Sequence, residues 1–293
     1  MNNSRKLTIG LLTHDDFDGA YFTIQSIRLH HPEVLHQIEF VVVDNNPDSP
    51  QGKALQKFAN WVKEPIKYIP HSTSTGTALR NLVFEHATTP YVLCLDSHVL
   101  LAPTALAQLI AFLDTHDTVD LLQGPMLSDN FHDVQTHMEP VWRDGMWGIW
   151  AVNPLGVDPT SQPFEIPAMG MGLFVCRRDA WLGFNPKFKG FGGEECYIHE
   201  KFRQAGRKTL CLPFLRWLHR FPRPAGPSYP VRWADRIFNY LVGHAELRLD
   251  PSPVLGHFRT ILPEAVIQAV LTDFSHHDSK SHRPTQLQRG YKP

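Results

Sequence analysis

Short apolar segments alternate with helical patterns in the first half of the chain, and this alternation limits the possible folds more than any other feature. The strand-like segments are Leu7–Leu12, Ile38–Val43, Ile66–Ile69, Tyr91–Leu95 and Val119–Gln123. The helical patterns between them cover Ala20–Leu29, Ala54–Val62, Thr75–Ala87 and Pro103–Leu113. Strands that alternate with helices in this way predict βαβ units. We therefore expect an α/β fold in which helices flank a mixed, mostly parallel sheet.

The second half of the chain is less regular. Phe131–Pro167 is rich in Trp, Pro and Gly, and we expect long loops there. Further strands are expected at Met171–Cys176 and Leu210–Leu212, and helices at Glu194–Ala205, Val231–Leu249 and Pro263–Phe274. The pattern predicts a main domain over residues 1–228, a helical C-terminal extension over 229–275 and a polar, mobile tail over 276–293.

The composition indicates a folded protein without a strong electrostatic preference for its partner. Hydrophobic residues make up 42% of the 293 residues, which suits a chain with a sizeable core. The 28 basic and 29 acidic side chains nearly cancel, so the net charge does not indicate a nucleic-acid-binding protein. A nucleic-acid acceptor stays open because five arginines gather in one segment, at Arg216, Arg220, Arg223, Arg232 and Arg236.

The sequence carries no sign of secretion or of a membrane span. The four cysteines form no Cys-x-x-Cys pair, and the N-terminal residues include no apolar segment typical of a signal peptide. No apolar run approaches the ~20 residues of a membrane-spanning helix. We therefore expect a cytoplasmic protein without a transmembrane segment.

The strand at Tyr91–Leu95 ends abruptly in Asp96, Ser97 and His98. Residues i and i+2 of an extended chain project to the same side, so this carboxylate and this imidazole can point into one crevice. The pair suits a divalent transition metal, and the imidazole favours Mn²⁺ over Ca²⁺, which prefers oxygen ligands. The alternative is that Asp96 caps the next segment and His98 only packs. Thr13 and Asp44 follow two other strands, and ligands of α/β sheets gather beyond such strand ends.

Four motifs in a fixed order resemble those of a known enzyme family. They read VVVDNNPDS, ALRNLVFEHATTPYVLCLDSHVLL, AMGMGLFVCRRDAWLGFNPKFKGFGGEECYIHEKF and WLHRF. In this order they resemble nucleotide-sugar glycosyltransferases with the GT-A (Rossmann-like) fold, close to glycosyltransferase family 2. The Asp-x-His wording followed by Gly-Gly-Glu is similar to polypeptide N-acetylgalactosaminyltransferases. The resemblance covers roughly Leu7 to Arg223, which is most of the chain.

The resemblance implies a metal site and a nucleotide site. Asp96 and His98 match the metal-binding motif, and His219 in WLHRF matches a third ligand supplied from far along the chain. The ion would be Mn²⁺ or Mg²⁺ and would bridge the two phosphates of the donor. The residues that match the nucleotide and donor site are Thr13, Asp44, Arg80, Asp96, Arg220 and Arg223. Asp44 would bind the base or ribose, unless it only begins a turn, and Arg80 would reach a phosphate, unless it is a solvated helix residue.

The segment GFGGEEC matches the acceptor-side motif of the family. Gly192 and Gly193 would let the backbone approach the sugar, and Glu194 would accept hydrogen bonds from sugar hydroxyls. Glu195 stands where inverting relatives carry an Asp general base and where retaining Asp-x-His relatives carry Asn. A carboxylate there favours inversion, although the rest of the pattern resembles the retaining group. Two acids in the first turn of a helix also have a purely structural explanation.

Trp142, Trp147 and Trp150 lie where relatives place residues that face the acceptor or the sugar. Aromatic rings stack well on sugars and bases, but core packing explains at least one of the three equally well.

The function that we expect is transfer of a sugar from a nucleoside-diphosphate sugar, preferably a UDP-sugar, to an acceptor hydroxyl, with a metal cofactor and with inversion. A retaining enzyme resembling the N-acetylgalactosaminyltransferases, a DNA-base-modifying glycosyltransferase and a non-catalytic nucleotide-sugar-binding protein stay open. A nucleotidyltransferase should carry a Gly-rich, basic loop after its first strand, and LLTHDDFDGA does not supply one.

Overall fold

A computed structural model describes residues 5–62, 65–223 and 226–279. Its centre is an eight-stranded sheet with the strand order β11-β13-β6-β12-β4-β1-β2-β3. The strands are β1 (Leu7–Thr13), β2 (Ile38–Asp44), β3 (Ile66–Pro70), β4 (Tyr91–Asp96), β6 (Leu121–Gln123), β11 (Phe164–Glu165), β12 (Leu173–Arg177) and β13 (Thr209–Cys211). Only β11 and β12 run against the other six strands. The expected mixed, mostly parallel sheet is therefore confirmed.

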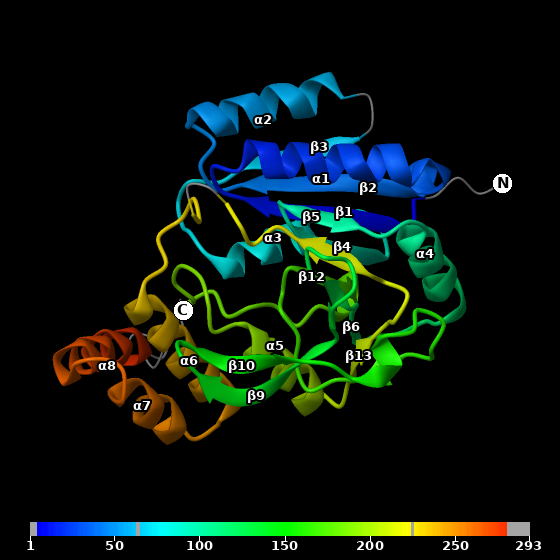
Figure 1. The fold of residues 1–293 in the computed structure, drawn as a ribbon. Coiled ribbons are helices and arrows are strands. Elements are labelled where there is room, and N and C mark those ends of the chain that lie inside the picture. Colours follow the sequence, from blue (N-terminus) through cyan, green and yellow to red (C-terminus); the bar gives the residue numbers. More distant parts are fainter. Residues whose placement is uncertain (1–4, 63–64, 224–225, 280–293) are drawn as a thin grey trace, which may run out of the picture.

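Helices cover both faces of this sheet (Figure 1). The helices are α1 (Phe17–His30), α2 (Pro50–Trp61), α3 (Arg80–His86), α4 (Ala105–Thr115) and α5 (Glu195–Gln204). Buried residues of α1, α2 and α4 belong to one hydrophobic cluster, and those of α3 and α5 belong to a second. Short 3₁₀ helices occur at Pro32–Gln37, Thr77–Leu79, Pro154–Gly156 and Arg178–Ala180.

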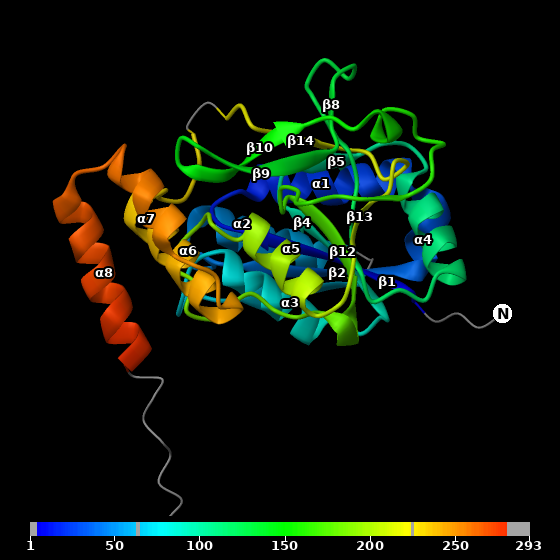
Figure 2. The same ribbon diagram turned by 90° about the horizontal axis from the view of Figure 1, so that it is seen from below.

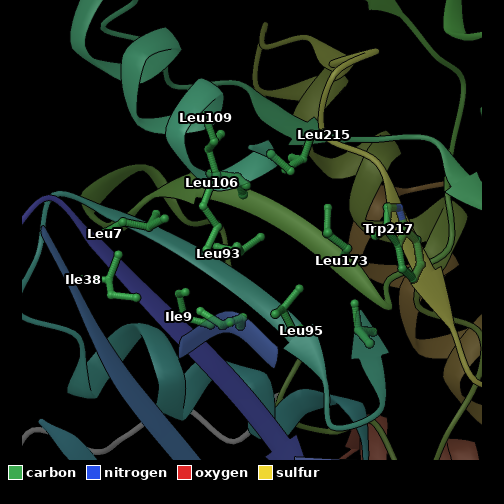
Figure 3. Packing of buried hydrophobic residues seen from close by; sticks show 14 of the residues in the cluster. Leu7, Ile9, Ile38, Leu93, Leu95, Leu106, Leu109, Leu173, Leu215 and Trp217 are labelled. Atoms are coloured by element: carbon green, nitrogen blue, oxygen red, sulfur yellow. The ribbon is translucent and has the colours of Figure 1, made fainter. Parts of the chain in front are cut away.

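The two clusters arise from the alternation of side chains along buried strands. In β1, Ile9 and Leu11 face the cluster of α1 and α4, whereas Leu12 faces the cluster of α3. Figure 3 shows the first of these clusters, where Leu106 and Leu109 of α4 pack near Leu93 of β4. A strand buried on both faces reads as a continuous apolar run, which is why these strands are recognisable in the sequence.

A second, four-stranded sheet lies beside the first and was not expected from the sequence. Its strands are β5 (Val99–Leu101), β14 (Trp217–His219), β7 (Met126–Leu127) and β8 (Val134–Gln135), in this order. Strands of two or three residues give no periodic signal in the sequence, because their pairing depends on partners far along the chain.

The expectation of long loops over Phe131–Pro167 was wrong. This segment contains an antiparallel hairpin of β9 (His137–Arg143) and β10 (Met146–Ala151), joined by Asp144 and Gly145. Asp144 has a φ of 49°, which Asp tolerates in a tight two-residue turn. The Asp-Gly pair is a hairpin signal, and the Pro and Trp content of the segment obscured it.

The described C-terminal residues, 226–279, form three helices, α6 (Trp233–Leu247), α7 (Ser252–Arg259) and α8 (Glu264–Ser279), of which α7 was not expected. Figures 1 and 2 show them together at one end of the molecule. Phe238 and Leu241 of α6 join the same buried cluster as Val83 of α3 and Ile198 of α5. The division at residue 228 stays a prediction. The first four residues of the tail predicted over 276–293 belong to α8, and 280–293 lie outside the described residues. No helix of the described part is long and apolar enough to cross a membrane.

Candidate active site

A cavity of about 310 Å³ opens at the C-terminal ends of β1 and β4. The predicted site residues that line it are Thr13, Arg80, Asp96, His98, Trp150, Gly192, Glu194, Glu195, His219 and Arg223. Further polar side chains in its wall are His14, Asp16, Asn45, Tyr229 and Arg236. The cavity thus lies where ligands of α/β sheets are held.

Asp96, His98 and His219 come together in this cavity. One ligand atom from each residue can be chosen so that all lie within 4.8 Å of one another. The Nε2 atoms of His98 and His219 are 3.1 Å apart, and His219 Nε2 is 3.5 Å from Asp96 Oδ2. A carboxylate and two imidazole nitrogens facing one point are a donor set that suits a divalent transition metal.

The small second sheet explains why His219 reaches this place. Strand β14 pairs with β5 so that His219 lies opposite Val99, the residue after His98. The backbone N–H of Arg220 then donates to the carbonyl of His98 at 3.1 Å. This antiparallel ladder fixes the two imidazoles side by side, although they are 121 positions apart in the chain.

Asp16, just before α1, orients His98 and was not among the predicted site residues. Its Oδ2 accepts hydrogen bonds from His98 Nδ1 at 2.7 Å and from Ser97 Oγ at 2.6 Å. Burial raises the pKa of Asp16, but the bonds from His98 and Ser97 lower it more, to about 2. A carboxylate accepts only, so Nδ1 of His98 is the donor in this bond, and the ring is held with Nε2 facing His219. The only sequence signal was the position of Asp16 after the first strand.

Arg80 lies beneath the metal-binding candidates. The residue is 5% exposed, and its side chain donates to Asp96 Oδ1 at 2.7 Å and to Thr77 Oγ1. Burial raises the pKa of Asp96, but the Arg80 guanidinium lowers it well below its usual range. Asp96 is therefore ionised and keeps Oδ2 for the cavity. The guanidinium of Arg80 is already bonded to Asp96 and Thr77. Its contact with a donor phosphate stays a prediction.

The two acids of the Gly-Gly-Glu-Glu segment have different surroundings. Glu194 is 6% exposed, accepts from Thr77 Oγ1 at 3.0 Å and lies 3.8 Å from the Arg80 guanidinium. Glu195 begins α5, is partly buried in the cavity wall and has no side-chain hydrogen bond or ion pair with other described residues. Burial and the neighbouring Glu194 raise the pKa of Glu195 to about 7. A partly protonated, unengaged carboxyl group can exchange a proton with a ligand near neutral pH.

The side of the cavity away from the sheet is formed by the segment after β14. Arg223 lines the cavity, and Tyr229 stacks on Phe191 with ring centroids 3.8 Å apart. Ser228 Oγ donates to the carbonyl of His14, which connects this segment to the end of β1. Arg236 of α6 also lines the cavity, so the C-terminal helices contribute to it directly.

Several predicted site residues lie outside the cavity. Asp44 is 1% exposed, and its oxygens accept from Tyr68 Oη at 2.7 Å and from the Asn46 N–H at 3.0 Å. The next residue, Asn45, lines the cavity instead. Arg220 is exposed and borders a separate hollow next to α1. Asp44 does not line the cavity, and its contact with the base or ribose stays a prediction.

Of the three predicted tryptophans and Gly193, most also lie outside the cavity. Only Trp150 lines the cavity. Trp142 and Trp147 stack on each other with ring centroids 5.8 Å apart, and Trp142 also contacts Tyr240 of α6 at 5.0 Å. Packing of the hairpin on α6 therefore accounts for these two rings. Gly193 lies behind the cavity, against the backbone of α6.

Comparisons with known proteins agree with this geometry. The family model described as glycosyl transferase family 2 matches residues 21–178, which is more than half of the chain. No curated protein sequence matches the chain significantly.

Solved structures share the fold at low sequence identity. A structure of GalNAc-T7 with UDP, GalNAc and Mn²⁺ is similar with a TM-score of 0.66 and 16% identity, over 97% of this chain and 59% of that one. The mannosyltransferase PcManGT from Pyrobaculum calidifontis, in complex with GDP-Man and Mn²⁺, has a TM-score of 0.57 and 15% identity, over 96% and 80%. S. aureus TarS 1-349 has a TM-score of 0.51 and 15% identity, over 96% and 76%.

The present chain thus spans less than two thirds of the GalNAc-T7 structure. These structures establish the GT-A architecture of the fold, and the family model adds the relationship in sequence. The chain belongs to glycosyl transferase family 2.

Proposed function

We propose that this protein is a metal-dependent glycosyltransferase that moves a sugar from a nucleoside-diphosphate sugar, preferably a UDP-sugar, to an acceptor hydroxyl. The observation that carries the proposal is the meeting of Asp96, His98 and His219 in one cavity with the unengaged carboxyl group of Glu195. Such a reaction needs a group that binds the charge of the donor diphosphate and a group that accepts the proton of the acceptor hydroxyl.

Asp96, His98 and His219 would hold the metal ion. The Nε2 atoms of the two imidazoles lie 3.1 Å apart, and His219 Nε2 lies 3.5 Å from Asp96 Oδ2, so the three donor atoms are close enough to share one cation. The donor set favours Mn²⁺ over Mg²⁺, because Mg²⁺ prefers oxygen ligands. When bound, such an ion supplies positive charge to the diphosphate of the donor and of the leaving group. GalNAc-T7 and PcManGT, which share the fold, both have structures with Mn²⁺ and a nucleotide.

The nucleotide would lie between the ends of β1 and β4 and the segment after β14. Thr13 at the end of β1 and Asn45 just after β2 line the first side, and Arg223 lines the second. The side chain of Arg223 bonds Tyr229, but its Nε is buried without a partner among the described residues, so a donor is left for phosphate oxygens. We infer that Arg223 binds the diphosphate, and that Asn45 takes the base-side position expected of Asp44.

Glu195 would act as the general base of an inverting reaction. It would accept the proton of the acceptor hydroxyl while the acceptor oxygen bonds to the anomeric carbon and the bond to the diphosphate breaks. The electrons of the broken bond remain on the diphosphate. Thr77 engages only Oε1 of Glu194, and Oε2 has no partner among the described residues, so Oε2 would accept a hydrogen bond from a hydroxyl of the donor sugar.

A retaining reaction is the second candidate. It is favoured by the Asp-x-His wording at Asp96 and His98 and by the fold shared with GalNAc-T7. The anomeric configuration of the product, followed by NMR from the start of the reaction, separates the two. A β-linked product from an α-linked donor supports Glu195 as base, and an α-linked product excludes that role.

The test of the proposed function is Mn²⁺-dependent hydrolysis of a panel of UDP- and GDP-sugars by the wild type and by His98→Ala. Release of nucleoside diphosphate from one donor, lost in the variant, would establish the reaction class and name the sugar. Nucleotide binding without release from any donor, even with hydroxyl acceptors added, would indicate a non-catalytic binding protein. Absence of nucleotide binding with and without Mn²⁺ would overturn the proposal.

A further inference from the structure

We propose that helix α6 holds Glu194 and Glu195 in place through the loop that precedes them, residues 189–193, and that Asn239 is the positioning residue that binds this loop. This inference rests on the proposed function, because it concerns the placement of Glu195 for that reaction. Nothing in the sequence of α6 pointed to the site, since Asn239 lies beyond all four motifs of the resemblance.

Asn239 binds the loop that leads into the acidic motif with its whole amide group. Its Oδ1 accepts the backbone N–H of Lys189 at 2.7 Å. Its Nδ2 donates to the carbonyls of Lys189 at 2.8 Å and of Gly192 at 2.9 Å. The side chain is completely buried, so water cannot replace these bonds. Three bonds from one buried amide fix the path of the loop.

Gly192 and Gly193 lie against α6, where a side chain on either residue would meet the helix. A Cβ atom on Gly192 would lie 2.4 Å from Arg236 Nε, and one on Gly193 would lie 3.2 Å from Asn239 Cβ. Both glycines have a positive φ, 98° and 90°, which other residues rarely adopt. The positive φ of both residues and the close packing of Gly193 on α6 therefore favour glycine at these positions, independently of any approach to a sugar.

The opposite side of the loop is held by the residues before α3. The carbonyl of Gly190 accepts the N–H of Thr77 at 3.0 Å, and Thr77 Oγ1 donates to Glu194 at 3.0 Å. The loop thus lies between Thr77 and Asn239, and Glu195 follows it directly as the first residue of α5. A shift of the loop would displace Glu195 from the point that it faces in the cavity.

The metal-binding candidates lie on other elements than this loop, and the hydrogen bonds of the described residues connect the loop to them only indirectly, through Thr77 and Arg80 to Asp96. Asp96 ends β4, His98 follows it, and His219 is held by the ladder between β5 and β14. Loss of the Asn239 amide should therefore weaken the chemical step and leave nucleotide binding in place. A residue that serves only general stability would not separate the two effects.

The test compares Asn239→Ser with Asn81→Ser. Asn81 is a matched control, because its amide also makes three hydrogen bonds to one loop, with Phe184 N, Phe184 O and Trp181 Nε1. It does not line the cavity. For each variant we would measure the thermal midpoint, the Kd of UDP with Mn²⁺, kcat and KM for donor hydrolysis, and hydrogen exchange of residues 189–195.

The expected result for Asn239→Ser is a kcat at least about tenfold lower, with KM and the Kd of UDP within about threefold of the wild type. Asn81→Ser should lose a similar amount of thermal stability and keep kcat within about threefold. Exchange at the Lys189 amide should accelerate in Asn239→Ser alone, since its acceptor is removed.

Three outcomes would overturn the inference. They are an unchanged kcat in Asn239→Ser, a parallel loss of UDP binding, and failure of Asn239→Ser to fold where Asn81→Ser folds. The exchange measurement does not need turnover. If the wild type hydrolyses no donor, faster exchange at residues 189–195 would still support the hold of α6 on the loop while the proposed function fails, and unchanged exchange would refute that hold as well.

Discussion

The Nε2 atoms of His98 and His219 lie 3.1 Å apart, although 121 positions separate the two residues in the chain. Two short strands, β5 and β14, bring them together, and Asp96 Oδ2 completes the group 3.5 Å from His219. We expect His98→Ala and His219→Ala each to weaken Mn²⁺ binding by more than the roughly 10–100-fold that loss of an outer-sphere partner costs. Isothermal titration with Mn²⁺ in the presence of UDP measures this.

His116→Ala is the matched control, because this exposed imidazole stacks on Phe112 and hydrogen-bonds only at the end of α4 among the described residues. It should leave the Mn²⁺ affinity unchanged. Equal affinity of the wild type and both site variants would mean that the three side chains do not form a metal site.

Asp16 is not one of the three metal-binding candidates, but its carboxylate binds Nδ1 of His98 and orients this imidazole. We expect Asp16→Asn to weaken Mn²⁺ binding by roughly 10–100-fold, because the amide can present its NH₂ group to Nδ1 and so favour the wrong tautomer of His98. Asp15→Asn is the control, since Asp15 binds the Asn46 side chain and does not contact His98. An Asp16→Asn variant with the affinity of the wild type would show that His98 needs no such orientation.

The large sheet was predictable from the sequence because its strands are buried on both faces. Ile9 and Leu93 lie in continuous apolar runs, and the helices between the runs have their own period. The metal-binding candidates are a different case. Asp96 and His98 show a local pattern, but His219 could be identified only through the resemblance, since no local pattern predicts that β14 pairs with β5.

Most other differences between the predicted and the observed site also come from contacts between residues that are far apart in the chain. Asp16 and Asn239 act through hydrogen bonds to residues about 80 and 50 positions away, and such contacts leave no trace in local periodicity. Asp44 was expected in the nucleotide site from its place at a strand end, but the Tyr68 hydroxyl occupies its carboxylate. The hairpin around Asp144 and Gly145 could have been recognised from its turn residues alone.

Glu195 should control the pH dependence of the reaction. Burial and Glu194 raise its pKa to about 7, so the free enzyme holds a protonated, inactive base below that pH. We expect kcat/KM to rise with pH through about 7 and then to level off. Glu195→Gln should lower kcat by roughly 10²–10⁴-fold, remove this rise and keep the Kd of UDP.

Glu200→Gln is the control for this prediction, since Glu200 lies on the same helix, pairs with Arg203 and does not line the cavity. A pH profile that is identical in the wild type and in Glu195→Gln would rule out Glu195 as the base.

The same carboxyl group should reduce stability at high pH. Its pKa is raised from 4.5 to about 7 on folding, so the folded state binds more protons than the unfolded state between these values. The free energy of unfolding should therefore fall as pH rises through this window, by at most about 1.4 kcal/mol per pH unit. Glu195→Gln should be more stable than the wild type at pH 8 and similar to it at pH 4. Urea unfolding at both pH values checks this, and a difference of the opposite sign would contradict the burial of the carboxyl group.

Trp142 and Trp150 belong to the same hairpin and should respond differently to the same change. Trp150 lines the cavity, whereas Trp142 stacks on Trp147 and packs on Tyr240 of α6. We expect Trp150→Leu to raise the KM for the donor or acceptor by about tenfold, because an aromatic face next to a sugar is lost.

Trp142→Leu should instead lower the free energy of unfolding by about 2 kcal/mol and leave KM unchanged, because the ring is a packing element between the hairpin and α6. Steady-state kinetics and urea unfolding on both variants test the pair together. A larger KM effect at Trp142 than at Trp150 would place the substrate on the other side of the hairpin, against α6 rather than over the metal-binding candidates.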